Sequence, residues 1–257
     1  KSFDFGLDLA ASYTFTQSKS LCPATSSQAA SNWNNTSTYR FSNAPELGYS
    51  AYNLPHMIKA SAFYRFHIAN NKNFTTTIGV IYQGRSGSPY SMLYSGDLNG
   101  DNGRGNDLMF IPTDEQIDLM PFKAQGNYTE ELQRQNLKAW LAKTPYLKDH
   151  RGEYFKRNAD NLPFENHFDF HVAEKMSVKV GKQVHSLELS LDILNVGNLL
   201  NKDWGRTYGT TYSNELISPL TYDGGKFQFL SSPDYVIKYP QSYYSRWRGQ
   251  LGLKYTF

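Results

Sequence analysis

Hydrophobic and polar residues alternate with a period of two in six separate segments of the chain. In the first segment Phe3, Leu9 and Phe15 share one parity with other apolar residues, whereas Asp4 and Asp8 share the opposite parity. Such alternation is typical of antiparallel strands that have one apolar and one polar face. We therefore predict strands over residues 2–16, 57–68, 74–85, 166–180, 186–195 and 245–257.

The predicted strands are long enough to cross a membrane. Soluble proteins favour strands of about 5–6 residues, and these segments are roughly twice that length. At about 3.3 Å per residue and a tilt near 40°, a strand of about 13 residues rises about 33 Å, more than the apolar band of about 25 Å. A soluble sandwich or a lipocalin-like barrel, the alternative for such alternation, does not need that height.

The connections between the segments alternate in length. Two are short, at residues 69–73 and 181–185, and three are long, at about 17–55, 86–163 and 196–244. Short periplasmic turns and long extracellular loops are typical of outer-membrane barrels. We therefore expect an all-β fold, an antiparallel transmembrane β-barrel in the outer membrane of a Gram-negative bacterium, with a periplasmic C-terminus.

Aromatic residues fall where a barrel would meet the two membrane interfaces. The residues expected at the periplasmic rim are Phe3, Phe5, Tyr64, Phe66, Phe74, Tyr255 and Phe257, and those at the outer rim are Tyr13, Phe15, Tyr82, Phe168, Phe170 and Trp247. Glu174 alone conflicts with its apolar parity, and we expect a β-bulge around residues 173–175 to turn it inward.

The opposite parity predicts a polar lumen. The residues expected to line it are Lys59, Arg65, Arg85, His167, Asp169, His171, Lys175, Glu188, Asp192 and Arg248. His167, Asp169 and His171 share one face, but neighbours on that face lie about 6.6–7 Å apart, so polar lining is favoured over a metal site.

Composition narrows the classes of function. The net charge of +3 is small and its charges are interspersed, which argues against nucleic acid as a partner. The single cysteine, Cys22, excludes an internal disulfide and a cysteine-based metal site. We find no nucleophile and base in a suggestive context, so we do not expect an enzyme.

Two stretches in the long connections carry local signals. DLNGDNGRGND (97–107) places Asp97, Asn99, Asp101 and Asp107 at calcium-loop spacing, but Asn102 and Leu108 stand where such a loop needs glycine and glutamate. A turn is the alternative to a calcium site, and no other cofactor is expected. TEELQRQNLKAWLAK (129–143) predicts a helix capped by Thr129 that packs through Leu137, Trp140 and Leu141. A lid or a partner contact is the alternative to packing alone.

Four stretches resemble one family. They are GRSGSPYSMLYSGDLNGDNGRGNDLMFIP (84–112), KDHRGEYFKRNADNLPFENHFDFHV (148–172), LDILNVGNLLNKDWG (191–205) and RWRGQLGLKYTF (246–257). They are similar to TonB-dependent outer-membrane receptors that carry a carboxypeptidase-regulatory-like domain (the Oar-like subgroup). The resemblance implies that residues 1–257 are the last six strands of a barrel of about 22 strands, whose plug and first strands lie outside the chain.

The resemblance also implies function and partners. It implies a receptor or transporter that moves a ligand across the outer membrane, with the remaining strands and plug, membrane lipid, the TonB energising complex and a surface lipoprotein as partners. The terminal residues Trp247, Leu251, Leu253, Tyr255 and Phe257 resemble the signal read by the β-barrel assembly machinery. A passive porin or a barrel-anchored surface-binding protein is the alternative.

Overall fold

One antiparallel sheet of six strands dominates the fold. The computed structural model describes residues 1–210, 217–223, 226–231 and 238–257. The sheet has the order β1-β4-β5-β10-β11-β16. Each long strand therefore pairs with the long strands that precede and follow it in the sequence. The strands are β1 (Leu7–Phe15), β4 (His56–Phe66), β5 (Phe74–Arg85), β10 (Glu165–Val180), β11 (Gln183–Leu194) and β16 (Arg248–Thr256). The predicted all-β class and all six predicted strands are confirmed.

The register gathers the apolar parity of all six strands on one face. Leu9 pairs with Ala62, Ala62 with Val80, and Val80 with Phe170. Phe170 pairs in turn with Ile193, whose strand pairs with β16. Residues directly opposite each other in an antiparallel sheet point to the same side, so the sheet has one apolar and one polar face.

The first predicted strand begins too early. The chain turns at residues 4–6, and β1 starts only at Leu7. Gly6 has a φ of 96°, which a side chain would disfavour, and its carbonyl accepts the Arg65 amide at 2.8 Å. Phe3 and Phe5 therefore belong to this turn, where their rings lie 5.3 Å apart, and not to the strand.

The last predicted strand also begins too early, because residues 242–245 form a short helix, α6 (Ser242–Ser245). The other four strands differ from prediction by at most three residues at either end, and the bounds of β5 match.

The predicted β-bulge near Glu174 is absent, so that expectation was wrong. Ala173, Glu174 and Lys175 pair in unbroken register on both sides of β10. Glu174 stays on the apolar face, where its carboxylate accepts a hydrogen bond from Thr76 Oγ1 at 2.5 Å. A polar neighbour on the adjacent strand thus takes the place of the expected turn inward.

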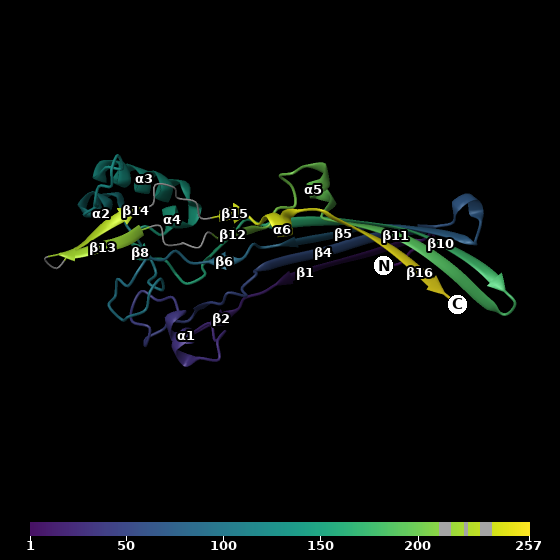
Figure 1. The fold of residues 1–257 in the computed structure, drawn as a ribbon, viewed down its shortest axis with the longest axis horizontal. Coiled ribbons are helices and arrows are strands. Elements are labelled where there is room, and N and C mark those ends of the chain that lie inside the picture. The colour runs from purple at the N-terminus through teal and green to yellow at the C-terminus, as the bar shows by residue number, and fades with distance from the viewer. Residues whose placement is uncertain (211–216, 224–225, 232–237) are drawn as a thin grey trace.

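Both short turns lie at one end of the sheet, and the long connections gather at the other end (Figure 1). Val180 pairs with Gln183 across a two-residue turn in which Gly181 has a φ of 63°. The β4–β5 turn contains the short 3-10 helix η1 (Ile68–Asn70).

The long connections fold into short elements of their own. The first holds β2 (Lys19–Ser20), α1 (Ala29–Asn34) and β3 (Gly48–Tyr49). The second holds β6 (Pro89–Tyr90), β7 (Phe110–Ile111), α2 (Asp114–Leu119), α3 (Glu130–Lys143), α4 (Pro145–Asp149), β8 (Glu153–Tyr154) and β9 (Asp160–Asn161). The third holds α5 (Val196–Leu200), β12 (Tyr208–Thr210), β13 (Ile217–Asp223), β14 (Lys226–Ser231), β15 (Lys238–Pro240) and α6.

The hydrophobic core lies in these connections and not in the sheet. Among the described residues, every buried apolar side chain except Ala173 belongs to a long connection. We call the following cluster the loop core: Tyr90, Met92, Tyr94, Met109, Ile111, Ile117, Phe122, Leu137, Trp140, Leu141, Leu147, Phe155, Leu162 and Ile217. The second long connection is therefore held by a hydrophobic core of its own.

The helix predicted at 129–143 is confirmed as α3. Thr129 Oγ1 accepts a hydrogen bond from the Leu132 amide at 3.2 Å and so caps the helix. Leu137, Trp140 and Leu141 are buried in the loop core, as predicted.

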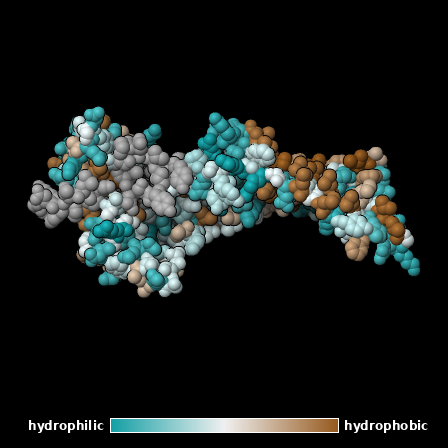
Figure 2. Space-filling model, viewed as in Figure 1, coloured by the Kyte–Doolittle hydropathy of each residue, from teal (hydrophilic) through white to brown (hydrophobic). Residues whose placement is uncertain are grey.

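The apolar face of the sheet is exposed. Leu251 and Leu253 have 75% and 72% of their surface accessible, and Leu189 has 57%. Figure 2 shows hydrophobic residues over the strands, whereas hydrophilic surface prevails among the drawn parts of the connections. None of the helices among the described residues combines the length and the apolar character that crossing a bilayer requires.

Candidate functional site

The polar face of the sheet holds all the residues predicted to line a lumen. Lys59 lies opposite Gln83 and Gln83 opposite His167, while His171 lies opposite Asp192. By this register the same face carries Lys59, Arg65, Arg85, His167, Asp169, His171, Lys175, Glu188, Asp192 and Arg248. That these residues line a lumen stays a prediction.

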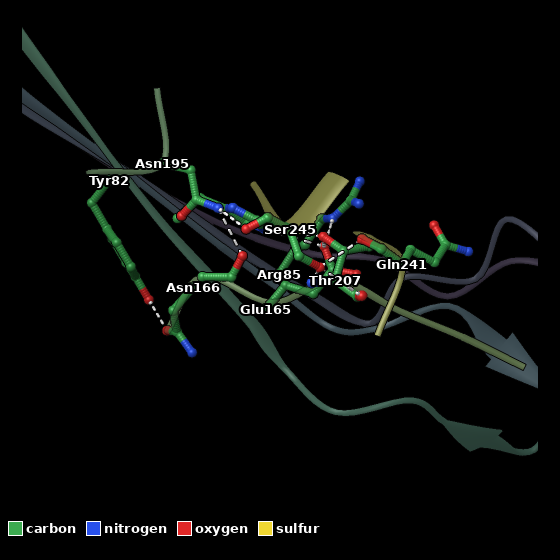
Figure 3. Close-up of polar contacts among 10 residues, drawn as sticks. Tyr82, Arg85, Glu165, Asn166, Asn195, Thr207, Gln241 and Ser245 are labelled. Atoms are coloured by element: carbon green, nitrogen blue, oxygen red, sulfur yellow. Dashed lines mark hydrogen bonds and ion pairs between the residues drawn. The ribbon is translucent and has the colours of Figure 1, made fainter. Parts of the chain in front are cut away.

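A buried carboxylate lies at the loop end of this face and is surrounded by polar side chains. Glu165 begins β10 opposite Arg85 and is 1% exposed. Arg85 Nε donates to Glu165 Oε2 at 2.8 Å (Figure 3). His167 Nε2 lies 3.7 Å from the same oxygen. Thr207 Oγ1 lies 3.4 Å from Glu165 Oε2 and 3.3 Å from His167 Nε2. Burying a carboxylate is costly unless it is paired, and the guanidinium supplies that pairing.

A second set of hydrogen bonds fixes the chain around this cluster. Asn195, in left-handed conformation after β11, donates its amide to Asp169 Oδ1 at 2.7 Å. Its side chain donates to the carbonyls of Gly205 at 2.8 Å and Ser245 at 3.0 Å. Ser245 Oγ accepts the Thr207 amide at 3.1 Å (Figure 3). These bonds join β10, β11 and the chain that enters β16.

His167, Asp169 and His171 do not converge on one point. His167 faces Glu165, Asp169 accepts the Asn195 amide, and His171 Nδ1 lies 2.6 Å from Asp192 Oδ1. Within the described ranges, no three His, Cys, Asp or Glu side chains form a group that could hold a metal ion. The three residues therefore have separate partners on the polar face.

The predicted calcium residues accept backbone hydrogen bonds in this structure. Asp97 carboxylate oxygens accept the amides of Gly100 at 2.7 Å and Asn102 at 2.9 Å. Asp101 accepts the amides of Ser42 at 2.7 Å and Gly103 at 2.8 Å. These contacts make the stretch a hydrogen-bonded turn that also holds the first long connection, and calcium binding stays a prediction.

Asp107 and Asn99 complete this turn. Asp107 Oδ2 accepts the Leu98 amide at 2.6 Å, while its Oδ1 is buried without a hydrogen-bond partner. Burial raises the pKa of Asp107, and the nearby Asp97 and Asp101 carboxylates raise it further against the lowering effect of the backbone amides. Asn99 Oδ1 accepts the Asp101 amide at 2.9 Å.

The predicted assembly residues are all accessible. Their exposed fractions are 46% for Trp247, 75% for Leu251, 72% for Leu253, 58% for Tyr255 and 81% for Phe257. They flank or belong to β16, an outer strand of the sheet. Their reading by an assembly machinery stays a prediction.

A cavity of about 520 Å³, which no sequence pattern predicted, lies between the first two long connections. Tyr39, Tyr49, Tyr154 and Arg157 contribute to its lining. The Arg157 guanidinium is buried and donates to the carbonyls of Leu21 at 2.6 Å, Ser20 and Glu46. Burial lowers its pKa. Residues more than a hundred positions apart build this cavity, and the one signal for it was the basic and aromatic stretch at 148–157.

Comparisons with family models, with curated proteins and with solved structures found no match to this chain.

Proposed function

We propose that the chain is the C-terminal barrel segment of a TonB-dependent outer-membrane receptor, which takes up a ligand through the outer membrane. The observation that carries this proposal is the distribution of apolar side chains. The sheet exposes one continuous apolar face, and the buried core lies in the long connections at one end. In water that exposed apolar face would promote aggregation, whereas in a membrane lipid would cover it.

The strand lengths and the turns support a barrel wall. The long strands hold 9 to 16 residues, and the two short turns lie at the same end of the sheet. A ring of only six strands would be about 12 Å across, smaller than known membrane barrels, which begin at eight strands. The outer strands β1 and β16 therefore need further strands beside them, as the proposed barrel of about 22 strands would provide.

Two features support transport over a purely structural barrel. The polar face carries charged and hydrogen-bonding residues that would line a lumen and contact a plug, with the Glu165 cluster at the loop end. The cavity between the first two long connections offers space for a ligand outside the membrane. The motif resemblance adds the TonB-dependent class, which neither feature specifies alone.

The test uses the complete gene product, produced in a Gram-negative host. The membrane fractions are separated, and the purified protein is mixed with the periplasmic domain of TonB. We expect the protein in the outer membrane and a stable complex with TonB that is lost when the first residues of the mature product are removed. An outer-membrane protein without TonB binding would be a porin or surface-binding barrel, and recovery in the soluble fraction would contradict both.

A further inference from the structure

The residues from Asn195 to Arg206, which we call the rim segment, lie beside the apolar face of the sheet at its loop end. The segment follows β11 and contains α5 (Figure 1). Gly197 and Trp204 line a groove of about 330 Å³ together with Phe164 and Phe168. Phe168 belongs to the apolar face, because its position on β10 has the same parity as Phe170.

The rim segment exposes apolar side chains next to this groove. The exposed fractions are 44% for Leu199, 73% for Leu200 and 57% for Trp204. Phe164 and Phe168 are also exposed, at 42% and 43%. In Figure 2 the hydrophobic surface of the strands continues up to the segment that contains α5. The segment itself is mostly hydrophilic in this view, with an apolar edge toward the strands.

The rim segment also carries two cations: Lys202 follows the two leucines in the chain, and Arg206 lines the groove together with Asp203. Lys202 is exposed and makes no ion pair with the residues that the structure describes. Arg206 pairs with Asp203 and donates its Nε to the Lys202 carbonyl at 3.1 Å. Tryptophan, leucine and basic side chains together are typical of segments that lie at a membrane interface, with the cations at lipid phosphates.

Internal hydrogen bonds hold the rim segment in shape. Asn198 Nδ2 donates to the carbonyls of Lys202 at 3.1 Å and Trp204 at 3.0 Å. Gly205 has a φ of 59°, and a Cβ there would meet Asn195 Oδ1 at 1.8 Å, so a side chain at this position would strain the backbone and displace Asn195. A preformed surface loses little entropy when it binds.

We infer that the rim segment binds the phosphate-bearing headgroup of an outer-leaflet lipid. Leu199, Leu200 and Trp204 enter the acyl region beside Phe168, while Lys202 and Arg206 contact the phosphate. This inference rests on the proposed position of the sheet in the outer membrane.

Tryptophan fluorescence can test the depth of the segment. The chain has 4 tryptophans, Trp33, Trp140, Trp204 and Trp247. Each variant of the complete protein keeps one of them and has phenylalanine at every other tryptophan, including those outside this chain. The complete protein is placed in vesicles of acyl-brominated phosphatidylcholine with lipid A. We expect quenching of Trp204 close to that of Trp247, and none of Trp140, which is buried in the loop core.

The controls separate this inference from the proposed function. Quenching of Trp247 without quenching of Trp204 would overturn the lipid site and leave the barrel in place. Absence of quenching at both positions would contradict the membrane position of the sheet itself. Quenching of the Trp33-only variant, from the first long connection, would show nonspecific contact and would also count against the site.

Charge variants test the phosphate contact. Binding of lipid A to the complete protein in detergent is measured by native mass spectrometry for Lys202→Gln, Arg206→Gln and Arg206→Lys. We expect the dissociation constant to rise about fivefold for each charge removed. Arg206→Lys, which keeps the charge, and Lys143→Gln, an exposed change on α3, should bind like the parent. Equal loss in Arg206→Gln and Arg206→Lys would indicate a role in loop shape and overturn the phosphate contact.

Discussion

At the scale of single residues, Glu165 is the carboxylate whose burial most needs a partner. It is 1% exposed, and the Arg85 guanidinium and the Thr207 hydroxyl lie around one of its oxygens. Removing one member of such a pair leaves an uncompensated buried charge, which typically costs about 3–5 kcal/mol, whereas an exposed pair contributes about 0–1 kcal/mol. Because Glu165 is buried, we expect this ion pair to contribute more to the stability of the fold than an exposed pair would.

Arg85→Ala should lower the stability of the folded protein by about 3 kcal/mol, because it leaves the buried Glu165 carboxylate without its cation. The matched control is Asp118→Ala, which removes an exposed pair with Lys138 at a similar distance, 2.6 Å against 2.8 Å. Stability is measured as the urea concentration at which the folded, heat-modifiable form of the complete protein disappears on a gel. Equal midpoints for the two variants would show that the Arg85–Glu165 pair does not hold the loop end together.

Asp101 should make the turn at 97–107 sensitive to acid. Burial raises its pKa, but the amides of Ser42 and Gly103 outweigh that effect, so its pKa in the folded state lies below the usual value. An acid with a depressed folded pKa contributes stability above its unfolded pKa of about 3.9, and loses that contribution as the pH falls through the folded value. Asp101→Asn should therefore destabilise the turn at pH 7 and have little effect at strongly acidic pH.

The measurement is hydrogen exchange at the Ser42 and Gly103 amides, in parent and variant at each pH, so that intrinsic exchange rates cancel. Faster exchange in the variant at pH 7, with the difference vanishing in acid, is the expected result. A difference that is independent of pH would mean that the side chain's shape, and not its charge, holds the turn.

At the scale of elements, period-two alternation was sufficient to predict the six strands, because each strand has one apolar and one polar face. It could not detect the turn before β1, where Phe3 and Phe5 keep the alternating pattern although Gly6 reverses the chain. Nor could one strand reveal that Thr76 lies opposite Glu174, which decides that no bulge is needed. Contacts between strands carried the missing information.

A new charge on β16 should lower the yield of assembled protein on the apolar face but not on the polar face. Leu251→Lys places an ammonium on the apolar face, where a charge near the bilayer midplane costs about 2–4 kcal/mol and less toward the interfaces. Gln250→Lys adds the same charge at the neighbouring position on the polar face. The yield of heat-modifiable protein in the outer membrane should fall for Leu251→Lys and stay near the parent for Gln250→Lys. Equal yields would contradict the assignment of the faces.

The aromatic end of the chain should matter for assembly. Deletion of Phe257, or Phe257→Asp, should reduce outer-membrane levels while each assembled molecule keeps its stability, since the residue is 81% exposed and adds little packing. Tyr244→Asp, at an exposed aromatic residue in α6, is the control. Levels measured by immunoblot of membrane fractions that are equal for all three would exclude an assembly role for Phe257.

At the scale of the whole molecule, the sequence predicted the asymmetry of short turns and long connections but not the interior of the connections. Thr38 bridges to Asp107, and Arg157 reaches the carbonyls of Ser20 and Leu21. Such contacts join segments far apart along the chain, and short elements with mixed patterns give no periodic signal for them. The loop core and the cavity could therefore be found only in the structure. The helix α3, in contrast, could be predicted from its capping residue and its apolar positions.

The central claim also concerns the whole molecule: we propose that the sheet crosses a membrane with its two ends on opposite sides. The most direct measurement is cysteine labelling of the complete protein in living cells, with Cys22 and every cysteine outside this chain replaced by serine. One variant carries Lys156→Cys in the long connections and another carries Lys182→Cys in the two-residue turn. We predict that a membrane-impermeant maleimide labels Cys at 156 in intact cells, and at 182 only after the outer membrane is permeabilised. Equal labelling of both positions in intact cells would contradict the account.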